Sequence, residues 1–169
     1  MDVREAIRGR RSIRRYKEGA VIPKADIEKI LEAAMMAPSA CNLRPWDFVV
    51  VSNRKKLDEI MEMSPYTQML KTASCAVIVC GEPQEFQGVV KEFWPQDCGA
   101  AIENMLLEAE GLGYGTCWCG FYPVMERVEL LRQAFEIKTI PMAVVALGVP
   151  EEKPDARGYY DPQKVRFID

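Results

Sequence analysis

The stretch Cys75-Ala76-Val77-Ile78-Val79-Cys80 lies in the most apolar run of the 169-residue chain, which covers residues 73–81. β-Branched side chains are frequent in it, and its length suits a strand but is too short to span a membrane. Apolar side chains at successive positions face both sides of a sheet. The stretch therefore predicts an internal strand of a sheet that is covered on both faces.

Strand-like and helical patterns alternate on either side of this stretch. Further strands are expected at residues 46–51, 115–120 and 141–147. Helical patterns are expected at residues 2–8, from 23 to before 38, at 53–61, at 65–71, from 95 or 97 to 111, and at 124–135. This alternation predicts a mixed central sheet of four strands flanked by helices. Neither a repeat nor a linker divides residues 1–169, so we expect a single domain.

The tail over residues 151–169 has a different character. It is polar and contains proline, yet it ends in the strand-like pattern Val165-Arg166-Phe167-Ile168 with no neighbouring segment to pair with. Such an arm either remains solvated or docks against a neighbour such as another subunit.

Residues 8–17 concentrate positive charge, with six cationic side chains and no carboxylate. The rest of the chain then carries 16 cationic residues against 25 acidic ones, because six of the 22 Lys and Arg lie here. Guanidinium groups together with the hydroxyl of Ser12 suit a phosphate. The stretch therefore favours an anion site, and a solvated basic turn remains the alternative.

Composition excludes several kinds of chemistry. The chain has no histidine, which removes Ser-His-Asp and Cys-His catalysis and histidine metal sites. The six cysteines lack paired CxxC spacing, so we expect no metal site. We expect the thiols to be reduced, and the Cys117-Trp118-Cys119 stretch to be a strand with small buried side chains. We therefore expect no catalytic protein side chain, and chemistry that belongs to a bound cofactor.

Targeting and charge point to a cytoplasmic protein. The first five residues lack the apolar core of a signal peptide, and no apolar run approaches 18 residues, so we expect no membrane partner. A pI near 5.2 argues against a general nucleic-acid binder.

Three stretches, in this order, resemble the signatures of the nitroreductase family of FMN-dependent oxidoreductases. The first is Arg10-Arg11-Ser12-Ile13-Arg14, and the second is residues 37–46. The third is the helix over residues 97–104 followed by Gly111-Leu112-Gly113 and the strand from Cys117 to Gly120. Gly148-Val149-Pro150 and the tail also fit, so the resemblance covers nearly the whole chain.

The resemblance implies an α+β homodimer with FMN at each subunit interface and with residues 150–169 as a dimerisation arm that adds to the partner subunit's sheet. It implies that NADH or NADPH reduces FMN and that nitroaromatic or quinone-type acceptors, small and aromatic, are reduced in a ping-pong mechanism. Flavin N5 would carry the chemistry.

The resemblance also implies a set of cofactor-binding residues. One subunit would hold the phosphate, ribityl chain and ring edge through Arg10, Arg11, Ser12 and Arg14. The partner would contribute Pro38, Ser39, Ala40 and Asn42. Backbone donors at Cys119 and Gly120 would lie near N5, and Arg157, or alternatively Lys164, would complete the phosphate cluster.

One departure from the family pattern, the role of one segment and two alternative functions stay open. Arg44 stands where the family often has Gln, and residues 84–94 are expected to form a lid or pocket wall, or else part of the core. The same flavin fold could support dehalogenation, flavin fragmentation, or ene or enone reduction. From another class, the basic stretch could belong to a non-catalytic module that binds an anion or nucleic acid.

Overall fold

Four strands form one sheet in a computed structural model that describes residues 1–82, 92–155 and 157–168. They are β1 (Trp46–Val51), β2 (Cys75–Gly81), β3 (Gly115–Gly120) and β4 (Ile140–Gly148), in the order β1-β2-β4-β3. The internal position of β2 confirms the expectation from its apolar sequence. All three pairings of neighbouring strands are antiparallel, so the expectation of a mixed sheet is wrong.

The position of β4 explains this correction. A single crossover through α4 joins β2 to β3, which therefore run in the same direction and would pair in parallel if they were neighbours. Instead β4, which comes last in the chain, lies between them and runs the opposite way. Both strands consequently meet an antiparallel partner.

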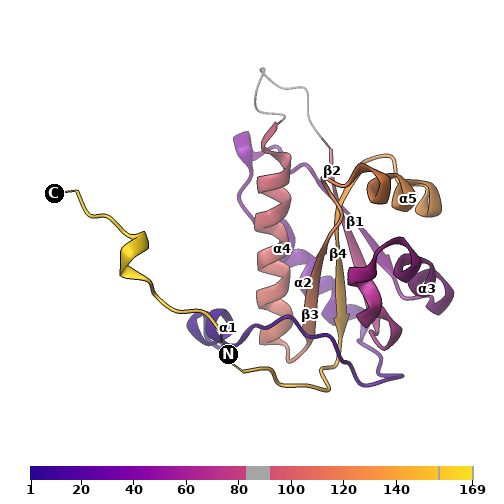
Figure 1. Ribbon diagram of the computed structural model, residues 1–169, viewed down its shortest axis with the longest axis horizontal. Helices are drawn as coiled ribbons and strands as arrows, with labels where there is room; N and C mark the ends of the chain where they lie inside the picture. The colour runs from indigo at the N-terminus through magenta and orange to yellow at the C-terminus, as the bar shows by residue number, and fades with distance from the viewer. Residues whose placement is uncertain (83–91, 156, 169) are drawn as a thin grey trace.

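Helices cover the two faces of the sheet in separate layers (Figure 1). The α-helices are α1 (Val3–Gly9), α2 (Lys24–Met35), α3 (Arg54–Met63), α4 (Trp94–Gly111) and α5 (Met125–Phe135). The short 3₁₀ helices are η1 (Ala40–Asn42), η2 (Pro65–Lys71) and η4 (Pro162–Lys164). One layer contains α2 and α4, and the other contains α3, η2 and α5. A capping box formed by Asp2 and Glu5 begins α1.

Side chains of β2 alternate between two cores. Val77 and Val79 belong to the core beneath α2 and α4, whereas Ile78 and Cys80 belong to the core beneath α3 and α5. Every residue of β2 is buried, as a strand covered on both faces requires.

The basic stretch runs in an extended conformation along the outer edge of β3. The amide of Ile13 donates to the carbonyl of Thr116 at 2.8 Å, and Tyr16 forms a bridge with Pro150 beyond the end of β4. The side chains of Ile13 and Tyr16 are buried, and Tyr16 is 0% exposed. This docking fixes the backbone that carries the arginines.

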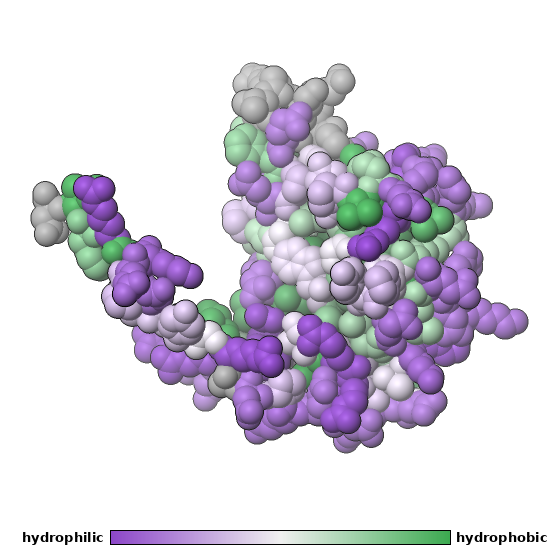
Figure 2. Space-filling view, in the orientation of Figure 1, coloured by the Kyte–Doolittle hydropathy of each residue, from purple (hydrophilic) through white to green (hydrophobic). Residues whose placement is uncertain are grey.

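Residues 151–155 and 157–168 belong to an arm that leaves the body of the protein (Figure 1). Figure 2 shows the arm standing clear of the body, with hydrophobic residues close to its end. Its large apolar side chains are exposed: Tyr159, Tyr160, Val165, Phe167 and Ile168. Within the described residues, no helix has both the length and the apolar character needed to cross a membrane.

We expect Gly148→Ala to lower the free energy of unfolding by about 1–3 kcal/mol, because overpacking a tight core forces strain. A Cβ at this position would lie 2.6 Å from Cδ1 and 3.1 Å from Cβ of Tyr16. Gly111→Ala is the matched control, since its Cβ would enter open space. Urea unfolding measures both variants, and equal stability of the two would contradict the packing described for Tyr16.

Candidate cofactor-binding site

A cationic pocket of about 430 Å³ lies where the basic stretch meets the start of the C-terminal arm. Its lining residues are Arg10, Arg11, Ser12, Arg14, Glu152, Pro154 and Arg157. Five residues predicted to bind phosphate or ribityl groups are therefore brought together: Arg10, Arg11, Ser12, Arg14 and Arg157. Four guanidinium groups face one carboxylate, so the pocket suits an anion.

Glu152 attaches the arm to the basic stretch. Its carboxylate accepts hydrogen bonds from the backbone amides of Arg14 at 2.6 Å and Arg15 at 3.2 Å, and from Nε of Arg15 at 3.3 Å. The bond from the amide of Arg14 is the main cause that lowers the pKa of Glu152 below its usual range. A second attachment comes from Arg11, whose Nε donates to the carbonyl of Asp155 at 3.1 Å.

The position of Arg10 depends on α4. Its Nε lies 3.3 Å from Oε1 of Glu103, and both side chains are partly exposed. An exposed pair of this kind contributes little to stability. It does hold Arg10 at the rim of the pocket, beside the helix.

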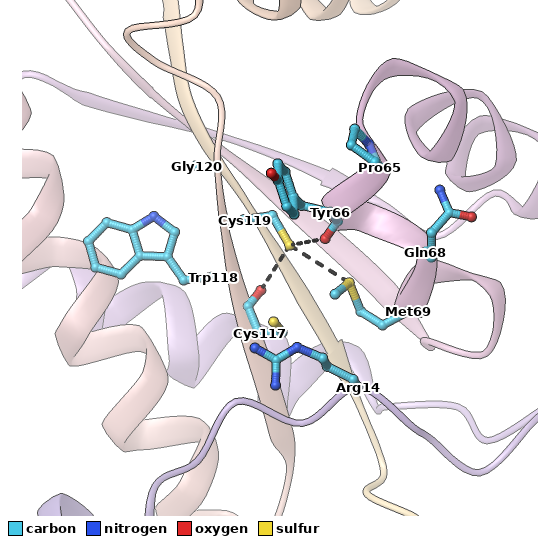
Figure 3. A pocket seen from close by; sticks show the side chains of 9 residues that line it. All are labelled: Arg14, Pro65, Tyr66, Gln68, Met69, Cys117, Trp118, Cys119 and Gly120. Carbon is cyan, nitrogen blue, oxygen red and sulfur yellow. Dashed lines mark hydrogen bonds between the residues drawn. The ribbon is translucent and has the colours of Figure 1, made fainter. Parts of the chain in front are cut away.

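A second pocket of about 520 Å³ adjoins the first, and Arg14 lines both (Figure 3). One wall is β3, from Cys117 to Gly120. The opposite wall is η2, through Pro65, Tyr66, Gln68 and Met69. Because the two pockets share a side chain, one elongated ligand with an anionic end and a flat end can occupy both.

The outer edge of β3 offers backbone donors to the second pocket. Backbone groups of an antiparallel strand point to alternate sides, and the carbonyl of Thr116 points outward to Ile13. The amides of Trp118 and Gly120 therefore point to the same open edge, whereas that of Cys119 points to β4. Of the two predicted backbone contacts, Gly120 is the one whose amide faces outward.

Cys117 and Cys119 project from the other face of β3 than Trp118, toward η2 (Figure 3). The thiol of Cys119 donates to the carbonyl of Tyr66 at 3.1 Å. The neighbouring Cys119 side chain, together with the charge of Arg14, lowers the pKa of Cys117 to about 7. Both cysteines are buried as expected, and both line the pocket; the resemblance implied a place there for the backbone of Cys119 but no role for either thiol.

The loop over residues 38–42, which was predicted to reach a partner subunit, lies against the first turn of α4. The amide of Ala40 donates to Oδ1 of Asp97 at 3.0 Å, in the first turn of α4. Asp97 precedes Glu103 by six residues, which is about 9 Å along a helix. Neither pocket that contains Arg14 is lined by the four predicted loop residues: Pro38, Ser39, Ala40 and Asn42.

Arg44 organises this loop. Its amide donates to Oγ of Ser39 at 3.0 Å, and its Nε donates to Oδ1 of Asn42 at 3.3 Å. Three residues with side chains have positive φ here, Cys41, Asn42 and Arg44, at 49°, 55° and 51°. The loop is thus held in a conformation that most residues disfavour.

The predicted lid or wall at residues 84–94 falls largely outside the described residues. At its described end, Trp94 is buried and packs edge to face with Tyr122 at a centroid distance of 4.9 Å. Trp94 is therefore part of the core.

Fold and pocket together define a class of protein. A four-stranded antiparallel sheet between two helical layers is a nitroreductase-like fold, and in this chain an arginine-lined pocket lies at the edge of the sheet. The chain belongs to the nitroreductase family, whose sequence model matches residues 7–94 and 65–149. The resemblance inferred from the three signatures is thereby confirmed.

Individual relatives agree with this assignment. The chain is 47% identical over 169 residues to the "Putative NADH dehydrogenase/NAD(P)H nitroreductase" of Methanothermobacter thermautotrophicus. The aligned region covers 99% of this chain and 87% of the relative. A solved structure of the same description from Parabacteroides distasonis is 34% identical, with a TM-score of 0.90 over 99% of this chain and 98% of that one. A "putative nitroreductase in complex with FMN" from Desulfovibrio desulfuricans is 27% identical, with a TM-score of 0.85 over 100% and 98%.

We expect Glu152→Gln to reduce stability at neutral pH and to remove part of the acid sensitivity of the wild type. A carboxyl whose folded pKa is lowered stabilises the fold above its unfolded pKa, about 4.3, and loses this effect as the pH falls through the lower folded pKa. Urea unfolding between pH 7 and pH 3 should therefore show the two proteins converging below about pH 4.

Glu151→Gln is the control for this experiment, because it makes the same change of charge one residue away. If Glu151→Gln alters the pH profile as much as Glu152→Gln does, the hydrogen bonds to Arg14 and Arg15 are not the cause.

Proposed function

We propose that the chain is an FMN-dependent oxidoreductase that accepts hydride from NADH or NADPH and passes it to small flat aromatic acceptors, nitroaromatics or quinones. The observation that carries the proposal is the pair of adjoining pockets that share Arg14, one cationic and one bounded by β3 and η2. FMN combines a phosphate dianion with a flat ring system, and its shape matches this pair. The FMN complex of the similar Desulfovibrio desulfuricans protein supports the choice of flavin.

The phosphate would lie among Arg10, Arg11 and Arg157, with the hydroxyl of Ser12 as a further donor. Guanidinium groups bind phosphate oxygens in pairs, which fixes the orientation of the bound group as well as its position. Among the described lining residues of the pocket, Glu152 is the one carboxylate. Its oxygens already accept hydrogen bonds from Arg14 and Arg15.

The ring would lie in the second pocket between β3 and η2. There the guanidinium of Arg14 can stabilise the negative charge that grows at the N1 and O2 edge on reduction, and the outward amide of Gly120 can donate near N5. When bound, FMN supplies a centre that accepts and donates hydride. The protein then needs to position, orient and shield the ring, and the absence of histidine from the sequence is compatible with that role.

We propose a ping-pong order for the two half-reactions. The ring would lie against β3 and η2 in the second pocket, so the donor and the acceptor would approach it from the same open side. The nicotinamide donor would leave before the acceptor enters, so both would use the same face of the ring in turn.

We also propose that the active form is a homodimer. The loop over residues 38–42 lines neither pocket that contains Arg14 within one chain, which is compatible with a loop that completes the site of a partner. The arm exposes Tyr159, Phe167 and Ile168, side chains that a partner surface would bury. Addition of the arm to the partner's sheet would cover them.

We expect Arg14→Ala to weaken FMN binding about tenfold or more, because a charged hydrogen bond contributes roughly 1.5–3 kcal/mol. Arg15→Ala is the matched control: it removes the neighbouring charge, but Arg15 lines neither pocket. Fluorescence titration of flavin-stripped protein with FMN measures both affinities. Equal losses in the two variants would contradict the assignment of Arg14.

Mixed dimers test whether the site is shared between subunits. Asn42→Asp introduces a negative charge at residue 42, and Asp tolerates the positive φ of this residue as readily as Asn does. Because the added charge would repel the flavin phosphate, we expect the Asn42→Asp homodimer to lose FMN, as the Arg14→Ala homodimer does. Dimers reassembled from the two variants should regain FMN at one of their two sites, because one site then receives both native residues.

The control mixture combines Arg14→Ala with Arg10→Ala, which act from the same subunit. It should contain no intact site and should remain colourless at 450 nm or thereabouts, where flavins absorb. No recovery in the first mixture would show that each site belongs to a single chain. Recovery in the control would show instead that Arg10 and Arg14 act from different subunits.

A further inference from the structure

Three sulfur atoms converge on one side of the second pocket (Figure 3). Sγ of Cys119 lies 3.7 Å from Sδ of Met69, which belongs to η2. Cys117 projects from the same face of β3, two residues before Cys119. All three residues line the pocket although at most 9% of each is exposed, and the proposed hydride chemistry uses none of their sulfur atoms.

We infer that Cys117, Cys119 and Met69 form a binding site for a soft monovalent metal ion, with Cu(I) as the ion of choice. Thiolate and thioether ligands select Cu(I) over ions that prefer oxygen or nitrogen. The described lining residues include no histidine, aspartate or glutamate, so no imidazole or carboxylate competes with the sulfur atoms for an ion in this pocket.

The thioether is the essential third ligand. In the described part of the chain, no three His, Cys, Asp or Glu side chains gather closely enough to hold a metal. Two sulfur atoms that lie 3.7 Å apart, each about 2.3 Å from one ion, subtend an angle of about 107° at that ion. This angle is compatible with three sulfur ligands around one centre.

Charge also favours a monovalent ion. Binding releases the two thiol protons to solvent, and two thiolates with one Cu(I) carry a net charge of −1. The guanidinium of Arg14 lines the same pocket and can neutralise that charge. The Cys119 thiol would exchange its hydrogen bond with the carbonyl of Tyr66 for the bond to the metal.

The test is an anaerobic competition titration of the full-length protein against the Cu(I) complex of bicinchoninate. Cys41→Asn serves as the background, because Cys41 is the exposed thiol among the described cysteines and its positive φ suits Asn. We expect one Cu(I) per chain, and X-ray absorption should show sulfur ligands at about 2.3 Å. Repeating the titration with Ag(I) removes any contribution from electron exchange with a bound flavin.

Variants of the ligands decide the outcome. In the same background, Cys119→Ser should abolish binding and Met69→Leu should weaken it about tenfold or more. Met69→Leu keeps the apolar volume and so preserves the fold. Cys75→Ser is the control, since Cys75 is buried in the other core beneath α4, and binding should be unchanged.

Unchanged affinity in Cys119→Ser or in Met69→Leu would overturn the site, and so would binding that disappears in Cys75→Ser. The inference does not depend on FMN, because metal uptake is measured directly and FMN binding is assayed separately. Protein that binds Cu(I) but no FMN would contradict the proposed function alone.

Discussion

The docking of residues 12–16 onto the edge of the sheet is the interaction on which the rest of the site depends. Ile13 and Tyr16 bury their side chains where Gly115 and Gly148 leave room for them. With these two side chains directed inward, the guanidinium of Arg14 is directed into both pockets. Apolar burial therefore positions the charge, and the surface ion pair of Arg10 adds only a local restraint.

Much of the fold could be predicted from local patterns, and the part that could not depends on contacts between distant segments. The strands at 46–51 and 115–120 were predicted with the observed bounds, and the helix expected at 124–135 is observed one residue shorter, as Met125–Phe135. Strand direction was mispredicted, because the insertion of β4 between β2 and β3 leaves no mark in the sequence of any one strand. Periodicity reports which faces are buried but not which strands are neighbours.

The candidate site divides in the same way. Residues 10–14 could be predicted as an anion site because their charges adjoin in sequence, and Arg157 was added through the family resemblance. Tyr66, Gln68 and Met69 were missed, since η2 carries no unusual pattern and reaches the pocket only through the packing of its layer. Cys117 and Cys119 were read as small apolar residues, which describes their burial and omits the Met69 sulfur beside them.

The tether between Glu152 and the amide of Arg14 has a consequence for the biosynthesis of the protein. These two residues are separated by 138 positions in the chain. A ribosome must therefore have synthesised the chain at least as far as Glu152 before the cationic pocket can close, and contacts of such long range are slow to form in folding. Nascent chains that stall before the arm emerges would expose their arginines without the carboxylate that holds the basic stretch in place.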